Sequence, residues 1–200
     1  MKLILIITVV ILSLNNLFAS DYKCDTLIDN TYFKTCYSFD HNSAIWSYAK
    51  ITDSNNTVGI TKRPSFYADK RIPLEHRVYS SDFTNTGFDR GHLQNDSNFD
   101  YSEESLKETY SMSNITLQYP KTNQISNRLI ENRQREILKT QKEIEIYILI
   151  YYGDEKVKNK ISIPTYFYII TSNKKNNFKE CHILKNDNIE YTLDQMKTEC

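Results

Sequence analysis

The spacing of apolar residues changes along the chain, and this spacing predicts its elements. Segments 143–152 and 161–172 are rich in Ile and Tyr, which is typical of β-strands. The polar residues 153–160 between them predict a hairpin connection. Apolar and aromatic residues within 37–48 favour earlier strands. With two helical segments, this mixed order predicts an α+β fold: a central antiparallel β-sheet with flanking helices.

Two segments carry helical signals. Ser102 precedes two acidic residues in SEESLKETYSM, and acids in the first turn favour a helix that begins there. Residues 123–141 contain few helix breakers, and their apolar residues recur at spacings of three and four. These residues are Ile125, Leu129, Ile130, Ile137 and Leu138. The sequence therefore predicts a short helix after Ser102 and a longer helix from Asn123.

The segments outside these elements give weaker signals. A β-type run begins at Val58, but Pro64 and Pro73 then restrict helix formation. Residues 76–88 favour a loop that contains the turn signal Asn-Thr-Gly. The tail from Asn173 is polar and weakly patterned.

The N-terminus differs from the rest of the chain. Lys2 precedes an uncharged, mostly apolar run over residues 3–14, and the small residues Ala19-Ser20 follow. This order is typical of a secretory signal peptide, whereas a membrane-spanning helix needs about 20 apolar residues. A retained anchor and an apolar core helix are the alternatives. We expect a signal peptide at 1–20 and a single domain at 21–200, exported to the periplasm or the medium of a bacterium, with no stable membrane partner.

Composition fits a globular protein, with 40% hydrophobic and 25% charged residues. Loss of the signal would remove one basic residue, Lys2, from 25 basic and 25 acidic residues, so the formal charge would change from 0 to −1. Nucleic-acid-binding proteins are often basic, and this balance argues mildly against that class. Segment 121–142, however, has six basic residues against two acidic ones, which offers a local surface for phosphates.

Four cysteines lie in two groups near the ends of the exported chain. An even number in an oxidising compartment predicts disulfides. We favour Cys24 with Cys36 and Cys181 with Cys200, because short loops close most readily. Free thiols, or a long crosslink between the two ends, are the alternatives.

Chemistry-bearing residues gather in GFDRGHLQNDSNFD, residues 87–100. A lone histidine is usually structural, but His92 at a strand end facing a cleft could accept a proton from water near neutral pH. Along the longer helix, Asn123, Asn127, Glu131 and Arg135 recur every four residues. Their oxygens could serve a hard cation such as Mg²⁺. A solvated helix face with a Glu131–Arg135 pair is the alternative.

These motifs together resemble the DNA/RNA non-specific endonucleases. This family is the DRGH group of the ββα-metal, or His-Me finger, nucleases and includes endonuclease G-like proteins. The resemblance covers roughly residues 58–170. The matching residues are Arg63-Pro64, Asp89-Arg90-Gly91-His92, Ser113-Asn114, Gln118, Asn123 and Glu131. The chain departs from the pattern at Gln94-Asn95, where Ala-Pro is usual, and at Asn98, where an Asp is usual.

The resemblance implies a role for each matching residue. His92 is expected to be the general base that activates water. Asn123 is expected to be the one direct protein ligand of Mg²⁺, with Mn²⁺ as a substitute, and Glu131 to hold a metal-bound water. Asp89 is expected to be structural. The other expected site residues are Arg63 and Arg90, for phosphate binding, and Asn114, which would orient the site.

The implied function is a secreted, Mg²⁺-dependent, sugar-non-specific endonuclease. It would hydrolyse phosphodiester bonds in DNA and RNA with little sequence preference, because contacts to the backbone carry no base information. One alternative is a catalytically inactive nuclease-fold binding protein of the cell envelope. Another is a disulfide-stapled envelope protein in which DRGH is only a turn. The sequence leaves the preference for DNA or RNA, the biological role and the oligomeric state open.

Overall fold

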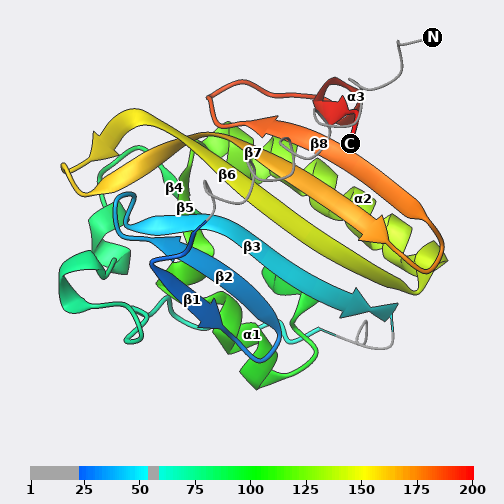
Figure 1. Cartoon of the computed structure of the whole chain (residues 1–200), viewed down its shortest axis with the longest axis horizontal. Helices are drawn as coiled ribbons and strands as arrows, with labels where there is room; N and C mark the ends of the chain where they lie inside the picture. The colour runs from blue at the N-terminus through cyan, green and yellow to red at the C-terminus, as the bar shows by residue number, and fades with distance from the viewer. Residues whose placement is uncertain (1–22, 54–58) are drawn as a thin grey trace, which may run out of the picture.

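A computed structural model describes residues 23–53 and 59–200, so the expected signal peptide lies outside the described residues. Within them, seven strands form one antiparallel sheet in the order β1-β2-β3-β6-β7-β8-β9 (Figure 1). The strands are β1 (Thr26–Asp29), β2 (Phe33–Ser38), β3 (Ser43–Thr52), β6 (Glu143–Val157), β7 (Ile161–Asn173), β8 (Phe178–Lys185) and β9 (Lys197–Thr198). The predicted α+β fold with a central antiparallel sheet is confirmed.

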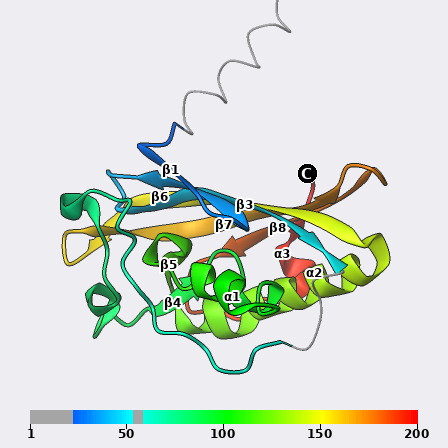
Figure 2. The ribbon, with the colours of Figure 1, turned by 90° about the horizontal axis from the view of Figure 1, so that it is seen from below.

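The helices lie on one side of this sheet (Figure 2). They are α1 (Glu103–Thr109), α2 (Arg128–Gln141) and α3 (Leu193–Met196), with a π-helical segment, η6 (Thr122–Asn127), leading into α2. Short 3₁₀ turns occur at Leu74–His76, Ser80–Phe83, Asp96–Asn98 and Met112–Asn114. A separate pair of strands, β4 (Asp89–His92) and β5 (Ile115–Gln118), lies on the helix side. Both predicted helices are therefore confirmed.

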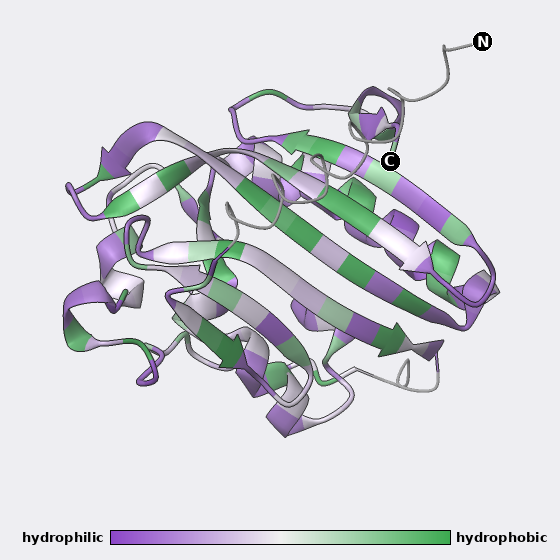
Figure 3. Cartoon of the chain, in the orientation of Figure 1, coloured by the Kyte–Doolittle hydropathy of each residue, from purple (hydrophilic) through white to green (hydrophobic). Residues whose placement is uncertain are grey.

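Side-chain alternation explains the long central strands. In β6, the isoleucines at 144, 146, 148 and 150 are each at most 6% exposed, while the residues between them are half-buried. Alternate residues of a strand point to opposite faces, so one face of β6 is apolar from Ile144 to Ile150. This banding along β6 and β7 is visible in Figure 3. Buried Ile130, Ile137 and Leu138 of α2 belong to the same core cluster as this face.

Three details differ from the sequence-based prediction. β6 continues to Val157, so only residues 158–160 remain as the turn, where Lys158 and Asn159 have positive φ. The polar tail contains β8, which the pattern concealed because Glu180 and His182 occupy two of its buried positions. Val58 lies outside the described residues, and residues 59–66 that follow it contain no strand.

Both favoured disulfides are present. Cys24 is bonded to Cys36, which lies in β2, and Cys181 of β8 is bonded to Cys200. Each bridge closes a short loop, with sequence separations of 12 and 19 residues, and fastens one end of the described chain to the sheet. Among the described residues, no helix is both long and apolar enough to cross a membrane.

Candidate active site

The two central motifs pair as neighbouring strands. DRGH forms β4, and the residues that follow Ser113-Asn114 form β5. The strands are antiparallel, with Asp89 opposite Gln118 and His92 opposite Ile115. The helical segment η6–α2 follows β5 directly, so the chain forms a β-β-α unit. Motifs that lie about 20 residues apart in the sequence are thus brought side by side.

Gly91 is required by the close approach of the two strands. A Cβ atom at this position would lie 2.2 Å from Cδ of Gln118, which is far inside van der Waals contact. The Gln118 side chain is itself only 2% exposed and has little room to move away. The glycine of DRGH is therefore explained by packing against the glutamine of the second motif.

His92 lies at the end of β4 among aromatic rings. Its ring centroid is 5.6 Å from that of Phe66 and 4.9 Å from that of Tyr110. Burial lowers the pKa of His92 to about 4, although the Asp96 carboxylate acts in the opposite direction. The imidazole is consequently neutral at pH 7. Its Nε2 atom is buried and has no hydrogen-bond partner among the described residues. A neutral imidazole accepts a proton on the ring nitrogen that carries none.

Asn123 is oriented by the first residue of DRGH. Its Nδ2 donates a hydrogen bond to Oδ2 of Asp89 at 3.0 Å, and Nε2 of Gln124 donates to the same oxygen at 2.8 Å. Because a carboxylate only accepts, this contact fixes which end of the Asn123 amide faces Asp89. The amide oxygen of Asn123 remains to bind a ligand. These contacts suit the structural role expected of Asp89, and the side chain that it orients is the expected metal ligand.

Glu131 lies two helical turns after Asn123. It accepts a hydrogen bond from Nδ2 of Asn127 at 3.1 Å. Burial raises the pKa of Glu131 to about 7; Arg135 opposes this shift, whereas Asp96 adds to it. Near neutral pH this carboxyl therefore gains or loses its charge easily, and a nearby cation would favour the ionised form.

The two arginines expected to bind phosphate are already held by the protein. Arg63 directs Nη1 to the carbonyl oxygen of Ile60 at 2.8 Å, and it forms ion pairs with Asp96 at 3.3 Å and Asp100 at 3.1 Å. A phosphate at Arg63 would have to share the guanidinium with these two carboxylates. Its expected phosphate contact stays a prediction.

Arg90 has a visible structural role. Its Nε and Nη2 donate to the hydroxyl and the carbonyl oxygen of Ser80 at 2.8 and 2.7 Å. The guanidinium carbon also lies 6.0 Å from the ring centroid of Phe66 and 5.9 Å from that of Phe83. Arg90 thus fastens the 3₁₀ turn Ser80–Phe83 to β4, and its expected phosphate contact likewise stays a prediction.

The polar atoms of the Asn114 side chain are all engaged by the protein itself. Its side chain is fully buried, with Nδ2 donating to the carbonyl oxygens of Gln94 and Thr109 at 3.0 Å each. Its Oδ1 accepts from the Gln94 amide at 3.0 Å, and its backbone oxygen accepts from the Leu93 amide at 2.9 Å. Asn114 therefore holds the chain that follows His92, which suits the orienting role expected for it.

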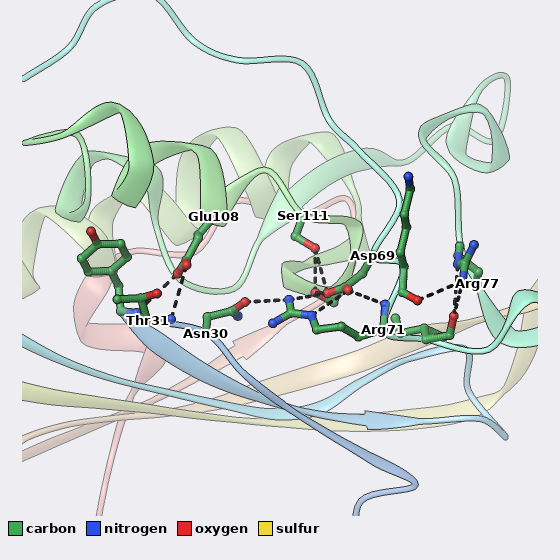
Figure 4. A network of polar contacts seen from close by, with 11 residues as sticks. Asn30, Thr31, Asp69, Arg71, Arg77, Glu108 and Ser111 are labelled. Atoms are coloured by element: carbon green, nitrogen blue, oxygen red, sulfur yellow. Dashed lines mark hydrogen bonds and ion pairs between the residues drawn. The ribbon is translucent and has the colours of Figure 1, made fainter.

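The segment that carries Arg63 and Phe66 is anchored by a buried acid. Asp69 accepts hydrogen bonds from Arg71 at 2.7 and 2.8 Å, from Ser111 at 3.1 Å and from Ser113 at 2.7 Å (Figure 4). Ser113 directly precedes Asn114, so the network connects this segment to the second motif.

Three further hydrogen bonds join this region to the sheet. Arg71 donates to Asn30 beside β1 at 2.7 Å. Glu108, at the end of α1, accepts from the backbone amides of Thr31 and Tyr32 at 3.3 and 3.4 Å (Figure 4). Sequence reasoning did not find Asp69, because a single acid in a loop gives no local signal of burial.

Replacing Asp69 with alanine should lower the free energy of unfolding by about 3 kcal/mol at pH 7, because the buried donors would lose their shared acceptor. Burial tends to raise the pKa of Asp69, but hydrogen bonds from Arg71 and Ser113 outweigh it and leave the pKa below its usual value. This stabilisation is therefore present above the unfolded-state pKa and is lost as the pH falls through the folded-state pKa. Denaturant unfolding at pH 7 and in acid measures it.

The exposed Lys34–Asp29 ion pair provides the control. Its side chains are 47% and 58% exposed, so Asp29→Ala should change the unfolding free energy by about 0–1 kcal/mol. Equal effects of the two substitutions would show that the Asp69 network contributes little.

Replacing Glu131 with glutamine should stabilise the metal-free protein by about 2 kcal/mol at pH 8. The folded-state pKa is raised, so the cost to folding grows as the pH rises from about 4.3, the usual pKa of Glu, to about 7 and stays at its full value above that, and neutral glutamine removes it. At pH 4 both side chains are neutral and the gain should disappear. Denaturant unfolding in EDTA at the two pH values measures this difference, and an equal effect at both would disprove the pKa assignment.

The donor set fits a cation that keeps most of its water. Within residues 23–53 and 59–200, no group of three or more His, Cys, Asp or Glu side chains is arranged to hold a metal ion. Mg²⁺ needs few protein oxygens and retains several waters. The oriented amide oxygen of Asn123, with Glu131 two turns further along, suits such an ion.

The family relationship follows from comparison with known proteins. Residues 15–199 match the sequence model of the DNA/RNA non-specific endonucleases. The chain belongs to this family. Its members are metal-dependent nucleases, so the β-β-α unit with His92 and Asn123 lies in a domain of the class that the motifs indicated.

Individual relatives agree with this assignment. Mitochondrial endonuclease G of Bos taurus and that of Homo sapiens are each 24% identical over 147 residues, or 66% of this chain. The match covers 49% and 50% of these relatives, so the chain spans about half their length. A solved structure of the EndoG/EndoGI complex, described as showing the mechanism of EndoG inhibition, aligns with a TM-score of 0.77 and 19% identity. It covers 86% of this chain and 80% of the matched chain, and it supports the fold.

Proposed function

We propose that the chain is an exported, Mg²⁺-dependent endonuclease that hydrolyses phosphodiester bonds in DNA and RNA with little sequence preference. The observation that carries the proposal is the contact between the strand that ends at the expected base, His92, and the expected metal ligand, Asn123. Asp89 begins the strand that ends at His92, and its carboxylate holds Asn123. The Asp96 charge opposes the lowering of the His92 pKa and adds to the raising of the Glu131 pKa, so one carboxylate acts on both groups.

The residues divide the chemical task among them. Neutral His92 would take the proton of the water that attacks phosphorus. Bound through Asn123, Mg²⁺ would supply positive charge at the phosphate and the leaving oxygen. Glu131 would hold a water beside the ion. Arg63, already fixed by Asp96 and Asp100, would add a preorganised positive charge.

Low sequence preference is expected from the chemistry of this site. A base, a cation and a guanidinium act on the phosphodiester backbone, which is the same at every nucleotide. None of these groups needs a particular base or sugar, so DNA and RNA should both be substrates.

A nicking assay tests the proposal. Purified oxidised protein, residues 21–200, is incubated with supercoiled plasmid and separately with RNA, in Mg²⁺, in EDTA, and in EDTA followed by excess Mg²⁺. We expect cleavage of both substrates in Mg²⁺, none in EDTA, and recovery on adding the ion. A gel shift without cleavage would favour the inactive binding protein. Neither cleavage nor a shift would favour an envelope protein without a nucleic-acid role.

Export is a separate part of the proposal. The apolar run at the N-terminus and the two disulfides support it, because disulfides persist in oxidising compartments. N-terminal sequencing of the protein from periplasm and medium should give a chain that begins near residue 21. Recovery of only full-length, reduced protein from the cytoplasm would overturn it.

A further inference from the structure

Asp96 contacts residues of the candidate site, but the sequence motifs assign it no role. It begins the 3₁₀ turn Asp96–Asn98, and its side chain is 20% exposed. Oδ2 accepts a hydrogen bond from the hydroxyl of Tyr110 at 2.8 Å, and the same oxygen lies 3.3 Å from Nε of Arg63. Asp96 lies immediately after Gln94-Asn95, where the chain departs from the family pattern. Asp96 therefore lies beside a departure from the family pattern, and it contacts Arg63, one of the expected site residues.

The turn that carries Asp96 is fixed in place. Asn95 Oδ1 accepts from the amide and the hydroxyl of Ser97 at 2.9 and 2.8 Å. Arg135 of α2 donates to the Ser97 hydroxyl at 3.2 Å. The carboxylate is thus presented by a short turn that is tied to its own start and to α2.

Tyr110 connects Asp96 to His92, because its hydroxyl binds Asp96 and its ring packs on the imidazole. Its ring lies edge-on to the His92 ring, with a centroid distance of 4.9 Å and an interplanar angle of 72°. Phe66 contacts both rings, at centroid distances of 4.9 Å from Tyr110 and 5.6 Å from His92. The Tyr110 hydroxyl is held by Asp96, so rotation of Tyr110 away from the imidazole would break a charge-assisted hydrogen bond.

The charged groups around Asp96 come from several elements. Arg63 comes from the segment before the 3₁₀ turns and also pairs with Asp100. His92 comes from β4, Tyr110 follows α1, and α2 contributes Glu131 with Arg135 nearby. Asp96 thus places negative charge near both His92 and Glu131, the two ionisable groups on which the mechanism depends.

We propose that Asp96 is a positioning residue of the nuclease reaction, which holds the Tyr110 ring and the Arg63 guanidinium around His92. The inference rests on the proposed function. Burial dominates the pKa of His92 and lowers it, and the Asp96 charge opposes that lowering, so the imidazole keeps more of its basicity. A base that is too weak takes a proton less readily in the transition state.

Asp96→Asn and Asp100→Asn form a matched pair for the test. Both carboxylates pair with Arg63, and their exposures are similar at 20% and 17%. Only Asp96 also holds Tyr110 and acts on His92 and Glu131. Tyr110→Phe is the third variant, since it keeps the ring and removes the hydroxyl that Asp96 binds.

Steady-state plasmid cleavage is measured from pH 3.5 to 9 in saturating Mg²⁺, a range that includes the His92 pKa of about 4. Asp96→Asn should lower kcat about 10- to 100-fold, as expected for a displaced catalytic group. It should also move the acidic limb of kcat/KM to lower pH, because a negative charge near His92 and Glu131 is gone. Asp100→Asn should leave that limb in place, and Tyr110→Phe should lower kcat without moving it.

An NMR titration of the His92 ring provides a readout that needs no catalysis. Asp96→Asn should lower the pKa of His92 relative to the parent, whereas Asp100→Asn should not. A parent rate and parent pH profile in Asp96→Asn would overturn the inference, as would equal profiles for the two Asn variants. If Asp96→Asn does not fold, an unchanged kcat in Tyr110→Phe overturns it. An inactive parent with the expected His92 titration would refute the proposed function alone.

Discussion

Replacing His92 with alanine should lower the rate of plasmid cleavage by about 10²- to 10⁴-fold while the fold is retained. The imidazole is the neutral base whose Nε2 is buried and unpaired among the described residues. Alanine removes this base and leaves a space between Phe66 and Tyr110. Single-turnover cleavage at pH 8 in saturating Mg²⁺ measures the loss, and added imidazole should restore part of the rate.

His76→Ala is the control for this experiment. His76 stacks on Phe39 with a centroid distance of 4.2 Å, and its Nδ1 lies 3.0 Å from the side-chain oxygen of Asn42. Neither of these residues contacts the ring of His92 in the same way, because His92 packs against Phe66 and Tyr110. The His76→Ala variant should cleave at nearly the parent rate. Parent-like cleavage by a folded His92→Ala variant would show that another group is the base.

Replacing Asn123 with alanine should lower Mg²⁺-dependent cleavage by at least about 100-fold, since even indirect partners of a metal site cost about 10- to 100-fold when lost. The substitution removes the amide oxygen that Asp89 orients. A weakened ion should also raise the Mg²⁺ concentration needed for half-maximal rate. Cleavage rates measured from micromolar to high millimolar Mg²⁺ test both effects.

Gln124→Ala separates metal binding from loss of a contact to Asp89. Gln124 donates to the same Asp89 oxygen, at 2.8 Å against 3.0 Å for Asn123. If the Asp89 contact alone mattered, the two variants would behave alike. We expect Gln124→Ala to keep a parent-like Mg²⁺ dependence, and a similar loss in both would refute the metal-ligand assignment.

Regular periodicity explains which elements were predictable. The alternating isoleucines of β6 and the apolar stripe of α2 pack together in one core, so local pattern and tertiary packing agree there. β8 was not predicted because Glu180, 7% exposed, pairs with Arg133 of α2 at 3.0 Å in a position where the pattern requires an apolar residue. A buried ion pair of this kind depends on a partner 47 residues away.

The site shows the same division between local and tertiary information. Motif spacing brought His92, Asn123 and Glu131 into one hypothesis, and the structure places them on one β-β-α unit. Motif spacing could not reveal that Arg63 is already ion-paired or that Tyr110 packs on His92. Those contacts join segments that are distant in the sequence, so no local sequence pattern predicts them.

The position of a bound Mn²⁺ ion, located by anomalous diffraction from crystals of the oxidised protein, tests the central claim most directly. One ion should bind the side-chain oxygen of Asn123 on the side that faces His92 and Glu131. An active protein whose crystals bind Mn²⁺ only at sites away from Asn123 would contradict it.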